Sequence, residues 1–205
     1  MLEAVNLGCV RGDRRLFRGL NFAIKPGEFI ELRGPNGGGK TSLLRIISGL
    51  APPAEGEVRW RGQNIRKLGE EYASEIAYVA HQNGVKDELS PTENLLIAGG
   101  VSGNALSREQ ARQALAAVGL QRQRDLTTRL LSAGQRRRLA LARLRASRAK
   151  LWILDEVLSS LDDAGMNLAR DLISAHLISE GMAIIATHQE LGLPAGLMSR
   201  IDLAT

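Results

Sequence analysis

The chain has 205 residues, a length that predicts one domain, or a core with a small inserted subdomain. Its 44% hydrophobic and 24% charged residues are ordinary for a globular protein and exclude disordered and collagen-like chains. The single cysteine, Cys9, rules out an internal disulfide and the class of small disulfide-rich secreted proteins. The 27 basic and 22 acidic residues leave a formal net charge of +5. This charge is compatible with anionic partners such as phosphates, and equally with a mildly basic surface that binds no such partner.

No apolar run approaches the ~20 residues that a bilayer-spanning helix needs. The first residues, MLEAVNLGCV, include an acidic third residue and lack the basic start of a signal peptide. We therefore expect the chain to stay on the cytoplasmic side of any membrane.

In the first third of the chain, short runs of β-forming residues alternate with glycine- or proline-containing breaks. They predict strands at Leu2–Leu7, Leu20–Ile24, Glu28–Leu32 and Glu57–Trp60. A helical pattern opens at Lys40 and ends near the stop signal of Gly49. A further apolar run predicts a strand at Ile76–Ala80.

The middle of the chain carries helical patterns with recognisable capping signals. Ser90 is followed by Pro91 and Glu93, and Ser107 is followed three residues later by Gln110, which makes a capping box. A long helix is expected from Arg136 to about Ser147.

The last third returns to strands. The continuous apolar runs Leu151–Leu154 and Ala183–Ala186 indicate strands buried on both faces, as in a parallel sheet. Between them, Gly165–Glu180 has the apolar face of an amphipathic helix. Strands at both ends, with helices between about 85 and 148, predict an α/β core that carries a helical insertion.

A glycine-rich loop lies between the strand predicted at Glu28–Leu32 and the helix that opens at Lys40. It reads Gly34-Pro35-Asn36-Gly37-Gly38-Gly39-Lys40-Thr41-Ser42. This run satisfies the phosphate-loop pattern G-x-x-x-x-G-K-[ST] in the required context. Its glycines let successive N–H groups turn inward around an anion, and the helix adds its positive dipole end. We expect Lys40 to reach the β- and γ-phosphates and Thr41 to hold Mg²⁺. The loop therefore predicts a nucleoside triphosphate site.

Two carboxylates, Asp155 and Glu156, follow the apolar run Leu151–Leu154. Such a pair is common in solvated turns, but ligands of open α/β sheets lie at this carboxyl edge, and a phosphate loop precedes it. We expect Asp155 to reach the Mg²⁺ shell through water and Glu156 to polarise the attacking water.

Two further polar residues follow predicted strands. His188 comes after Ala183–Ala186 and Thr187, at the ligand edge of the sheet, where a γ-phosphate contact is plausible. Gln82 follows Ile76–Ala80 and can reach the metal or its water.

The segment Leu131-Ser132-Ala133-Gly134-Gln135 precedes the predicted long helix. Ser132 and Gln135 make a capping box, an explanation that needs no ligand. Gly134 argues against that explanation alone, because a glycine in the first turn costs ~1 kcal/mol relative to alanine. A close approach of the backbone to a ligand explains it, so Ser132, Gly134 and the helix dipole are expected to form a second anion site.

Taken in order, these motifs resemble those of the ATP-binding-cassette (ABC) ATPases, and the resemblance covers essentially the whole chain. The matching motifs are the phosphate loop, the Q-loop at Gln82, the signature at Leu131–Gln135, Walker B at Asp155 with Glu156, the D-loop at Ser160-Leu161-Asp162 and the switch histidine His188. The resemblance implies a P-loop NTPase fold, with a RecA-like core and antiparallel β lobe in 1–83 and 151–205 and a helical subdomain in about 84–150.

The same resemblance implies hydrolysis of ATP with Mg²⁺ by a head-to-tail homodimer of cassettes. The signature serine Ser132 of one subunit is expected to close on ATP held by Lys40 of the other. Three positions depart from the family pattern: Ala133 replaces a glycine, Val157 replaces a proline, and Arg11 stands where an aromatic ring usually stacks on adenine. The planar guanidinium of Arg11 can stack on the base instead.

Within this family, the chain is most similar to the ATP-binding subunit of cytochrome c biogenesis, or haem export-type, transporters. The stretches that carry this similarity are GPNGGGKTSLLRIISGL, AHQNGVKDELSPTENL, LSAGQRRRLALARL, LWILDE and ATHQ. It implies an integral membrane partner subunit and a peripheral location at the cytoplasmic face of the bacterial inner membrane. The expected contact with that partner is a groove beside Gln82 that extends to about Gly100.

Two other interpretations use the same residues. Another small ABC transporter ATPase, for lipoprotein release, cell division or metal uptake, shares all of the chemistry. A nucleic-acid-associated cassette ATPase is suggested by the basic cluster Arg136, Arg137, Arg138, Arg143, Arg145, Arg148 and Lys150. Relatives of that kind carry long coiled-coil insertions or two cassettes, which this chain lacks, so we expect no nucleic-acid partner.

Overall fold

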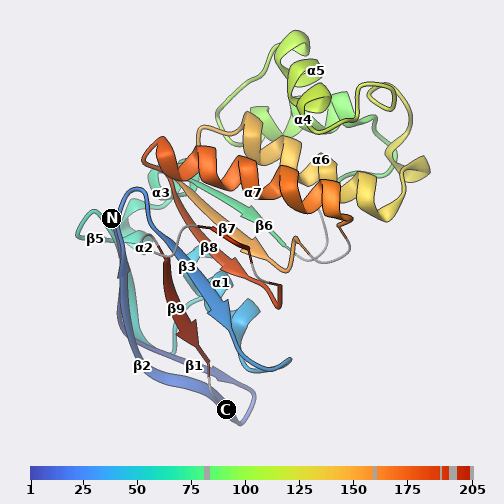
Figure 1. Ribbon diagram of the computed structural model, residues 1–205. Coiled ribbons are helices and arrows are strands. Elements are labelled where there is room, and N and C mark those ends of the chain that lie inside the picture. Colours follow the sequence, from blue (N-terminus) through green and yellow to red (C-terminus); the bar gives the residue numbers. More distant parts are fainter. Residues whose placement is uncertain (81–83, 159–160, 190, 194–197, 204–205) are drawn as a thin grey trace.

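The computed structural model describes residues 1–80, 84–158, 161–189, 191–193 and 198–203. Figure 1 shows a central sheet with helices on both sides and a second sheet beside it. The described strands are β1 (Leu2–Arg11), β2 (Arg14–Ile24), β3 (Phe29–Arg33), β4 (Glu55–Trp60), β5 (Gln63–Asn64), β6 (Ile76–Val79), β7 (Leu151–Asp155), β8 (Met182–Ala186) and β9 (Met198–Asp202). The described helices are α1 (Lys40–Ile47), α2 (Ile65–Leu68), α3 (Glu70–Ser74), α4 (Pro91–Val101), α5 (Arg108–Ala117), α6 (Ala133–Ala146) and α7 (Asp163–Ile178), with a 3₁₀ turn at Thr128–Leu130.

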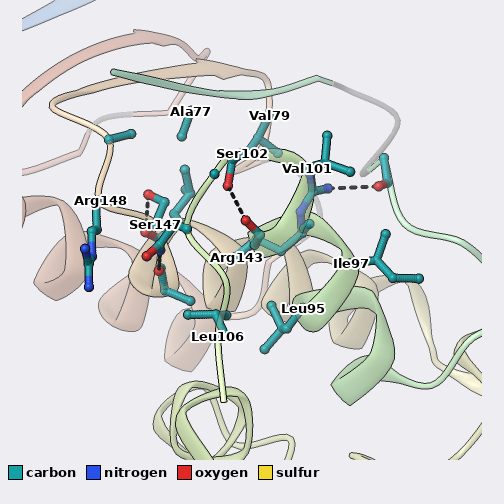
Figure 2. A pocket seen from close by; sticks show the side chains of 18 of the residues that line it. Ala77, Val79, Leu95, Ile97, Val101, Ser102, Leu106, Arg143, Ser147 and Arg148 are labelled. Carbon is teal, nitrogen blue, oxygen red and sulfur yellow. Dashed lines mark hydrogen bonds between the residues drawn. The ribbon is translucent and has the colours of Figure 1, made fainter. Parts of the chain in front are cut away.

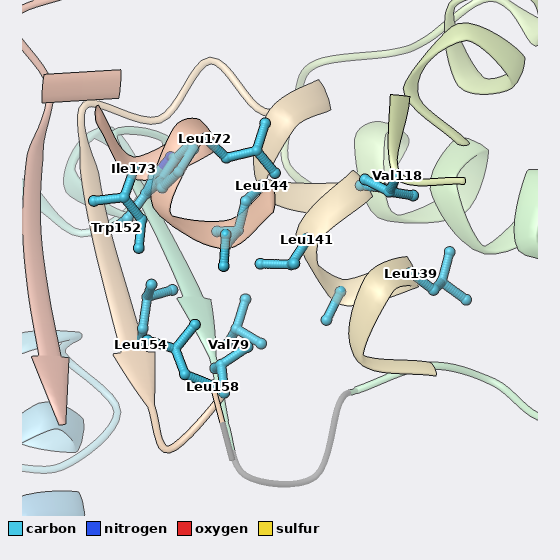
Figure 3. Packing of buried hydrophobic residues seen from close by; sticks show 14 of the residues in the cluster. Val79, Val118, Leu139, Leu141, Leu144, Trp152, Leu154, Leu158, Leu172 and Ile173 are labelled. Atoms are coloured by element: carbon cyan, nitrogen blue, oxygen red, sulfur yellow. The ribbon is translucent and has the colours of Figure 1, made fainter. Parts of the chain in front are cut away.

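The central sheet is parallel and has the strand order β6-β7-β8-β3-β9. β7 and β8 are buried along their whole length because helices cover both faces, so they are continuously apolar apart from Asp155 at the end of β7. Alternate residues of β7 face opposite sides: Leu151 and Ile153 pack with α1, whereas Trp152 and Leu154 pack with α6 and α7. The sheet thus separates two hydrophobic clusters, and Figure 3 shows the one on the α6–α7 side.

This cluster continues from the sheet into the helical segment, where Val118 and Leu139 belong to it (Figure 3). The three helices α4, α5 and α6 each begin at a serine that forms a complete capping box, at Ser90–Glu93, Ser107–Gln110 and Ser132–Gln135. The capping boxes expected from the sequence are therefore present. The helical segment shares its core with the sheet, and its treatment as a separate subdomain remains a proposal.

The second sheet is antiparallel, with the order β2-β1-β4-β5. It packs against α1 through the inward side chains of β1 and β4, which include Leu2, Leu7, Val58 and Trp60. This sheet and α1 therefore form one side of the molecule, and α6 and α7 form the other (Figure 1).

The predicted fold class, a parallel α/β sheet with an antiparallel β lobe and helices, is confirmed. Several boundaries were wrong. β2 begins at Arg14, well before the predicted start, because the outer half of this edge strand is rich in arginine and carries no apolar pattern. β9 had no sequence signal, since it is a partly exposed edge strand. α6 begins at Ala133, so Ala133, Gly134 and Gln135 form its first turn rather than precede it.

Among the described residues, no helix combines the length and hydropathy required to cross a bilayer.

Candidate active site

The carboxyl ends of three neighbouring strands meet at one edge of the parallel sheet. β3 pairs with β8, and β8 pairs with β7. The phosphate loop follows β3, His188 follows β8, and Asp155 and Glu156 lie at the end of β7. Because parallel strands deliver their carboxyl ends to the same edge, groups from distant parts of the sequence become neighbours there.

The phosphate loop turns at glycines whose backbone lies in the left-handed region. Gly34, Gly37 and Gly39 have φ values of 145°, 77° and 101°. A side chain at Gly34 would place its Cβ 2.7 Å from the carbonyl oxygen of Leu203, so position 34 requires glycine. The Gly38 N–H donates to the carbonyl of Pro35 at 3.0 Å and closes the loop on itself.

The loop leads directly into α1, whose N-terminus is open to an anion. Among the described residues, no side chain caps this helix, and no acidic residue lies in its first turn. The N–H groups of the first turn and the positive end of the helix dipole therefore remain available to a phosphate group.

Lys40, the first residue of α1, is 5% exposed and lies inside the loop. Its Nζ donates hydrogen bonds to the carbonyl oxygens of Gly34 at 2.7 Å and Pro35 at 3.1 Å. These bonds hold the ammonium group within the curve of the loop. Because a lysine ammonium has three donors, a third N–H remains for a ligand oxygen.

Thr41 and Asp155 join α1 to the end of β7. The Thr41 hydroxyl donates to Oδ1 of Asp155 at 3.3 Å, and Asp155 is 3% exposed. The Tyr78 hydroxyl donates to the other carboxylate oxygen, Oδ2, at 3.4 Å. A hydroxyl and a carboxylate beside a phosphate loop are the hard oxygen donors that Mg²⁺ prefers, so Thr41 and Asp155 fit a magnesium ion.

Glu156 has an unusual backbone for a residue with a side chain. Its φ of 54° lies in the left-handed region, and its N–H donates to the carbonyl of Ala186 at 3.0 Å, which ties β7 to the end of β8. Its Oε1 lies 3.6 Å from Nε2 of His188. The strained backbone thus turns the carboxylate toward the histidine of the neighbouring strand, as is common at functional sites.

A second basic group lies within electrostatic reach of Glu156. Burial lowers the pKa of the Arg137 guanidinium, and the smaller effect of the Glu156 charge raises the same pKa. Arg137 is 7% exposed and belongs to α6, on the far side of the sheet from α1.

The signature residues lie at the start of α6. Leu131 is buried in the core, Ser132 is exposed, and Ala133, Gly134 and Gln135 make up the first turn. The Ser132 hydroxyl accepts from the Gln135 N–H at 3.2 Å, and the Gln135 side chain accepts from the Ser132 N–H at 2.9 Å. A Cβ at Gly134 would meet nothing within 4 Å, so internal packing does not require this glycine.

A hollow of about 310 Å³ opens at this helix terminus. Its lining residues are Gly119, Leu120, Ser132, Gly134, Gln135, Arg138 and Asp162. Asp162 caps α7 through the Gly165 N–H at 2.8 Å, and this hydrogen bond, followed by that from Arg138, lowers the pKa of Asp162. The signature and the D-loop aspartate therefore border the same hollow.

The signature and the phosphate loop are not brought together within one chain. α1 packs on one face of the sheet and α6 on the other (Figure 1), and no described phosphate-loop residue lines the signature hollow. Among the described residues, the signature hollow is thus separate from the phosphate loop.

Two other predicted site residues remain untested. Gln82 and Ser160 lie outside the described residues.

Arg11 is the exposed last residue of β1 and pairs with Arg14 across the hairpin turn. Burial raises the pKa of the Cys9 thiol, and the Ser42 side chain and then the Arg11 charge partly offset this rise. Arg11 therefore lies within electrostatic range of the region where the phosphate loop enters α1.

An apolar groove of about 480 Å³ lies between β6 and α4, next to Gly84 (Figure 2). Ala77 and Val79 line it from β6, and Ile97 and Val101 line it from α4. Val101 is 86% exposed and Ile97 is 43% exposed, which is unusual for apolar side chains of this size. The groove lies where the sequence predicted a contact surface for a membrane partner.

Three arginines of the basic cluster that suggested nucleic-acid binding make contacts within the protein. Arg136 donates to Asp87 at 2.9 Å, Arg138 to Asp162 at 3.0 Å, and Arg143 to the carbonyl of Gly84 at 2.9 Å. Guanidinium groups that are used in this way hold loops and helices together. They do not form a row of free charges of the kind that tracks a nucleic-acid backbone.

Three groups near the site had not been singled out from the sequence: Tyr78, Arg138 as the partner of Asp162, and Phe17. A Cβ at Gly39 would lie 3.3 Å from Cδ1 of Phe17, so β2 covers the phosphate loop there. Tyr78 lies between Ala77 and Val79 on β6, which pairs with β7. The alternation of side chains between the two faces of a strand was the only sequence signal that set Tyr78 apart from these neighbours.

Comparison with known proteins agrees with this geometry. The sequence profile described as "ABC transporter" matches residues 17–159. A cytochrome c biogenesis ATP-binding export protein, CcmA, from Dechloromonas aromatica is 48% identical over 203 residues, which cover 99% of this chain and all of the relative. A protein of the same name from Nitrosomonas europaea is 49% identical and covers 93% of this chain and 90% of its own.

Solved structures show the same fold. A putative ABC transporter ATP-binding protein from Pyrococcus furiosus superposes with a TM-score of 0.84 at 25% identity, over 98% of this chain and 96% of that one. A dimeric ATP-binding cassette in a post-hydrolysis state with ADP and Pi superposes with a TM-score of 0.80 at 26% identity, over 92% of this chain and 88% of that one.

Proposed function

Because this chain belongs to the ABC transporter family and, within it, to the cytochrome c biogenesis ATP-binding export proteins, we propose that it powers a transporter for c-type cytochrome biogenesis. The chain is an ABC-type ATPase. In the proposed complex it supplies the energy-coupling subunit, and a separate integral membrane subunit carries the transported molecule. The convergence of the phosphate loop, Asp155, Glu156 and His188 at one sheet edge supports ATP hydrolysis most directly, and the similarity to the export proteins supports the pathway.

The roles of the site residues follow from their positions. The loop amides and Lys40 hold the triphosphate, because inward N–H groups and a buried ammonium neutralise its charge. Glu156 orients and polarises the attacking water, and His188 holds the Glu156 carboxylate at the same edge and contacts the γ-phosphate. Gln82 is assigned to the metal or its water.

Thr41 and Asp155 are the proposed magnesium-binding residues, the first directly and the second through water. A magnesium ion held by these residues would supply positive charge to the phosphate groups of the nucleotide. The buried carboxylate of Asp155 keeps its position through the hydroxyl groups that flank it.

We assign the signature hollow to a nucleotide held by a second copy of the chain. Ser132, Gly134 and the N-terminus of α6 offer donors to an anion, and internal packing leaves Gly134 open. Since these residues lie across the sheet from the phosphate loop, the ATP site is completed by a head-to-tail homodimer. Hydrolysis then depends on dimer closure. Because a bound membrane subunit moves with the two copies, dimer closure couples hydrolysis to movement of that subunit.

The groove between β6 and α4 is assigned to the membrane subunit. An apolar groove with exposed Ile97 and Val101 suits the apolar face of an amphipathic helix from a cytoplasmic loop of that subunit. With this contact, the proposed location of the chain is the cytoplasmic face of the inner membrane, as a peripheral protein. There it draws on cytoplasmic ATP.

A pair of matched variants tests the proposed function. In a bacterium that lacks its own copy, the wild-type chain should restore haem-stained c-type cytochromes and co-purify with an integral membrane protein from detergent-solubilised membranes. Val101→Glu should lose both properties. Ile178→Glu is the control, because Ile178 is 82% exposed on α7, outside the groove. Full restoration by Val101→Glu would contradict the groove assignment, and failure of the wild-type chain to restore cytochromes would contradict the proposed pathway.

A further inference from the structure

Tyr78 lies on the face of β6 that leads to the active site. It pairs with Ile153 in the parallel register of β6 and β7. Paired residues of parallel strands share a face, and Asp155 lies two residues beyond Ile153 on that face. The side chain of Tyr78 packs against the hydrophobic cluster on the α1 side of the sheet and reaches Asp155. Tyr78 also belongs to the lining of the groove, together with Ala77 and Val79.

The two oxygens of the Asp155 carboxylate each face a hydroxyl group. Oδ1 lies 3.3 Å from the Thr41 hydroxyl, and Oδ2 lies 3.4 Å from the Tyr78 hydroxyl. Both distances are long for a hydroxyl–carboxylate hydrogen bond, which indicates that the carboxylate lies between the two donors rather than tightly against one of them. Its orientation depends on both hydroxyl groups.

Tyr78 can act only as a donor in this arrangement. An ionised carboxylate has no hydrogen to donate, so the hydrogen of this bond comes from the phenol. A phenol O–H aimed at a carboxylate fixes the rotation of that carboxylate without competing with it for a cation.

We propose that Tyr78 is a positioning residue for magnesium binding: its hydroxyl holds Oδ2 of Asp155, so that Oδ1 stays turned toward Thr41 and the phosphate loop. This inference rests on the proposed magnesium site of Thr41 and Asp155. A hydroxyl ligates a cation through an oxygen lone pair, so the Thr41 O–H stays available to Oδ1 of Asp155. The Tyr78 hydroxyl holds the other carboxylate oxygen, Oδ2, and so limits rotation of the carboxylate about this bond.

The test measures the contribution of Mg²⁺ to nucleotide binding, separately from turnover. The dissociation constant of ADP is measured by calorimetry in excess EDTA and again in excess Mg²⁺, and their ratio is the magnesium gain. Tyr78→Phe should reduce this gain by about 3- to 10-fold, the effect of one net hydrogen bond, and leave ADP binding in EDTA unchanged. Binding in EDTA shows that the phosphate loop is folded, so a general loss of structure is recognised.

Tyr72→Phe is the matched control. The Tyr72 hydroxyl is buried and donates to the carbonyl of Ile47 at 2.7 Å, at the other end of α1. This variant also loses one phenol hydrogen bond but should keep the wild-type magnesium gain. A full gain in Tyr78→Phe, or an equal reduction in Tyr72→Phe, would overturn the inference.

Asp155→Asn separates this inference from the proposal on which it rests. If Asp155→Asn loses the magnesium gain and Tyr78→Phe keeps it, only the role of Tyr78 fails. If the wild-type chain shows no gain, or Asp155→Asn keeps it, the magnesium site itself is wrong.

Discussion

Arg138 in the first half of α6 donates from Nη2 to both carboxylate oxygens of Asp162, at 3.0 and 3.2 Å. Asp162 also caps α7 through Gly165, so this interaction ties the helix that begins at the signature to the helix that follows the D-loop. Both residues line the hollow beside Ser132. The two segments that we assign to the dimer interface are thus positioned relative to each other within the monomer.

Arg138→Met should separate the role of this pair in turnover from any role in stability. The Asp162 side chain is 67% exposed and that of Arg138 is 25% exposed, so solvent screens the pair and the urea midpoint should change little. ATP hydrolysis should fall about 10-fold or more, because the signature loses its fixed position relative to Asp162. Phosphate release and urea titration measure the two effects. Wild-type turnover in Arg138→Met would show that the pair has no part in the dimer interface.

Lys40→Ala should weaken ATP binding by about 10-fold or more, since it removes a charged donor from the phosphate loop. The measurement is the rise in melting temperature on addition of MgATP, compared with that of the wild-type chain. Lys67→Ala, which removes an exposed lysine from α2, is the control. An undiminished ATP-induced shift in Lys40→Ala would contradict the role of Lys40.

Glu156→Gln should lower hydrolysis by about 10²- to 10⁴-fold, because an amide of the same shape cannot act as a general base. ATP binding should persist, and the variant should accumulate as an ATP-bound dimer on size-exclusion chromatography. Adding Lys40→Ala to this variant should abolish the dimer, since the dimer requires bound nucleotide. Hydrolysis at the wild-type rate would remove Glu156 from the proposed role.

Ser132→Arg should block dimer closure while leaving ATP binding by the monomer intact. Both Ser132 and Ser107 cap a helix through a capping box, so Ser107→Arg is a control that loses a comparable cap, worth about 1 kcal/mol. The two variants should be similarly destabilised to urea, but only Ser132→Arg should lose turnover. Equal turnover in both would mean that Ser132 is a helix cap and nothing more.

His176 should make the folded chain less stable in mild acid. Its ring stacks on Trp152 with centroids 3.9 Å apart, and burial lowers the pKa of His176 more than its backbone hydrogen bonds raise it. Below pH ~6.5 the unfolded chain therefore takes up a proton that the folded chain does not. As the pH is lowered further, the free energy of unfolding decreases until the folded-state pKa is reached.

Urea titrations between pH 7.5 and 5.5 measure this effect. His176→Phe keeps an aromatic ring on Trp152 but cannot titrate, so its free energy of unfolding should fall less over this range than that of the wild-type chain. Parallel curves for the two proteins would show that His176 does not contribute.

Much of the site could be predicted because its chemistry depends on local sequence. The phosphate loop needs its glycines, Lys40 and Thr41 within nine consecutive residues, and the capping boxes at Ser90, Ser107 and Ser132 are formed by residues three positions apart. The buried strands β7 and β8 were equally clear, since a strand covered on both faces must be apolar throughout.

The remaining features depend on contacts between segments that are distant in the chain. The register of β6 against β7 brings the Tyr78 hydroxyl to Asp155, and the fold of α6 against α7 brings Arg138 to Asp162, although neither pair is marked by sequence spacing. The edge strand β9 and the outer half of β2 had no apolar pattern in the sequence, because part of each is exposed to solvent and does not need apolar side chains. The amino-acid sequence alone determined the type of fold and the phosphate-binding chemistry, since both are encoded in neighbouring residues. Only the tertiary structure decided that the signature lies across the sheet from the phosphate loop, because the face to which each helix packs follows from long-range burial of apolar side chains.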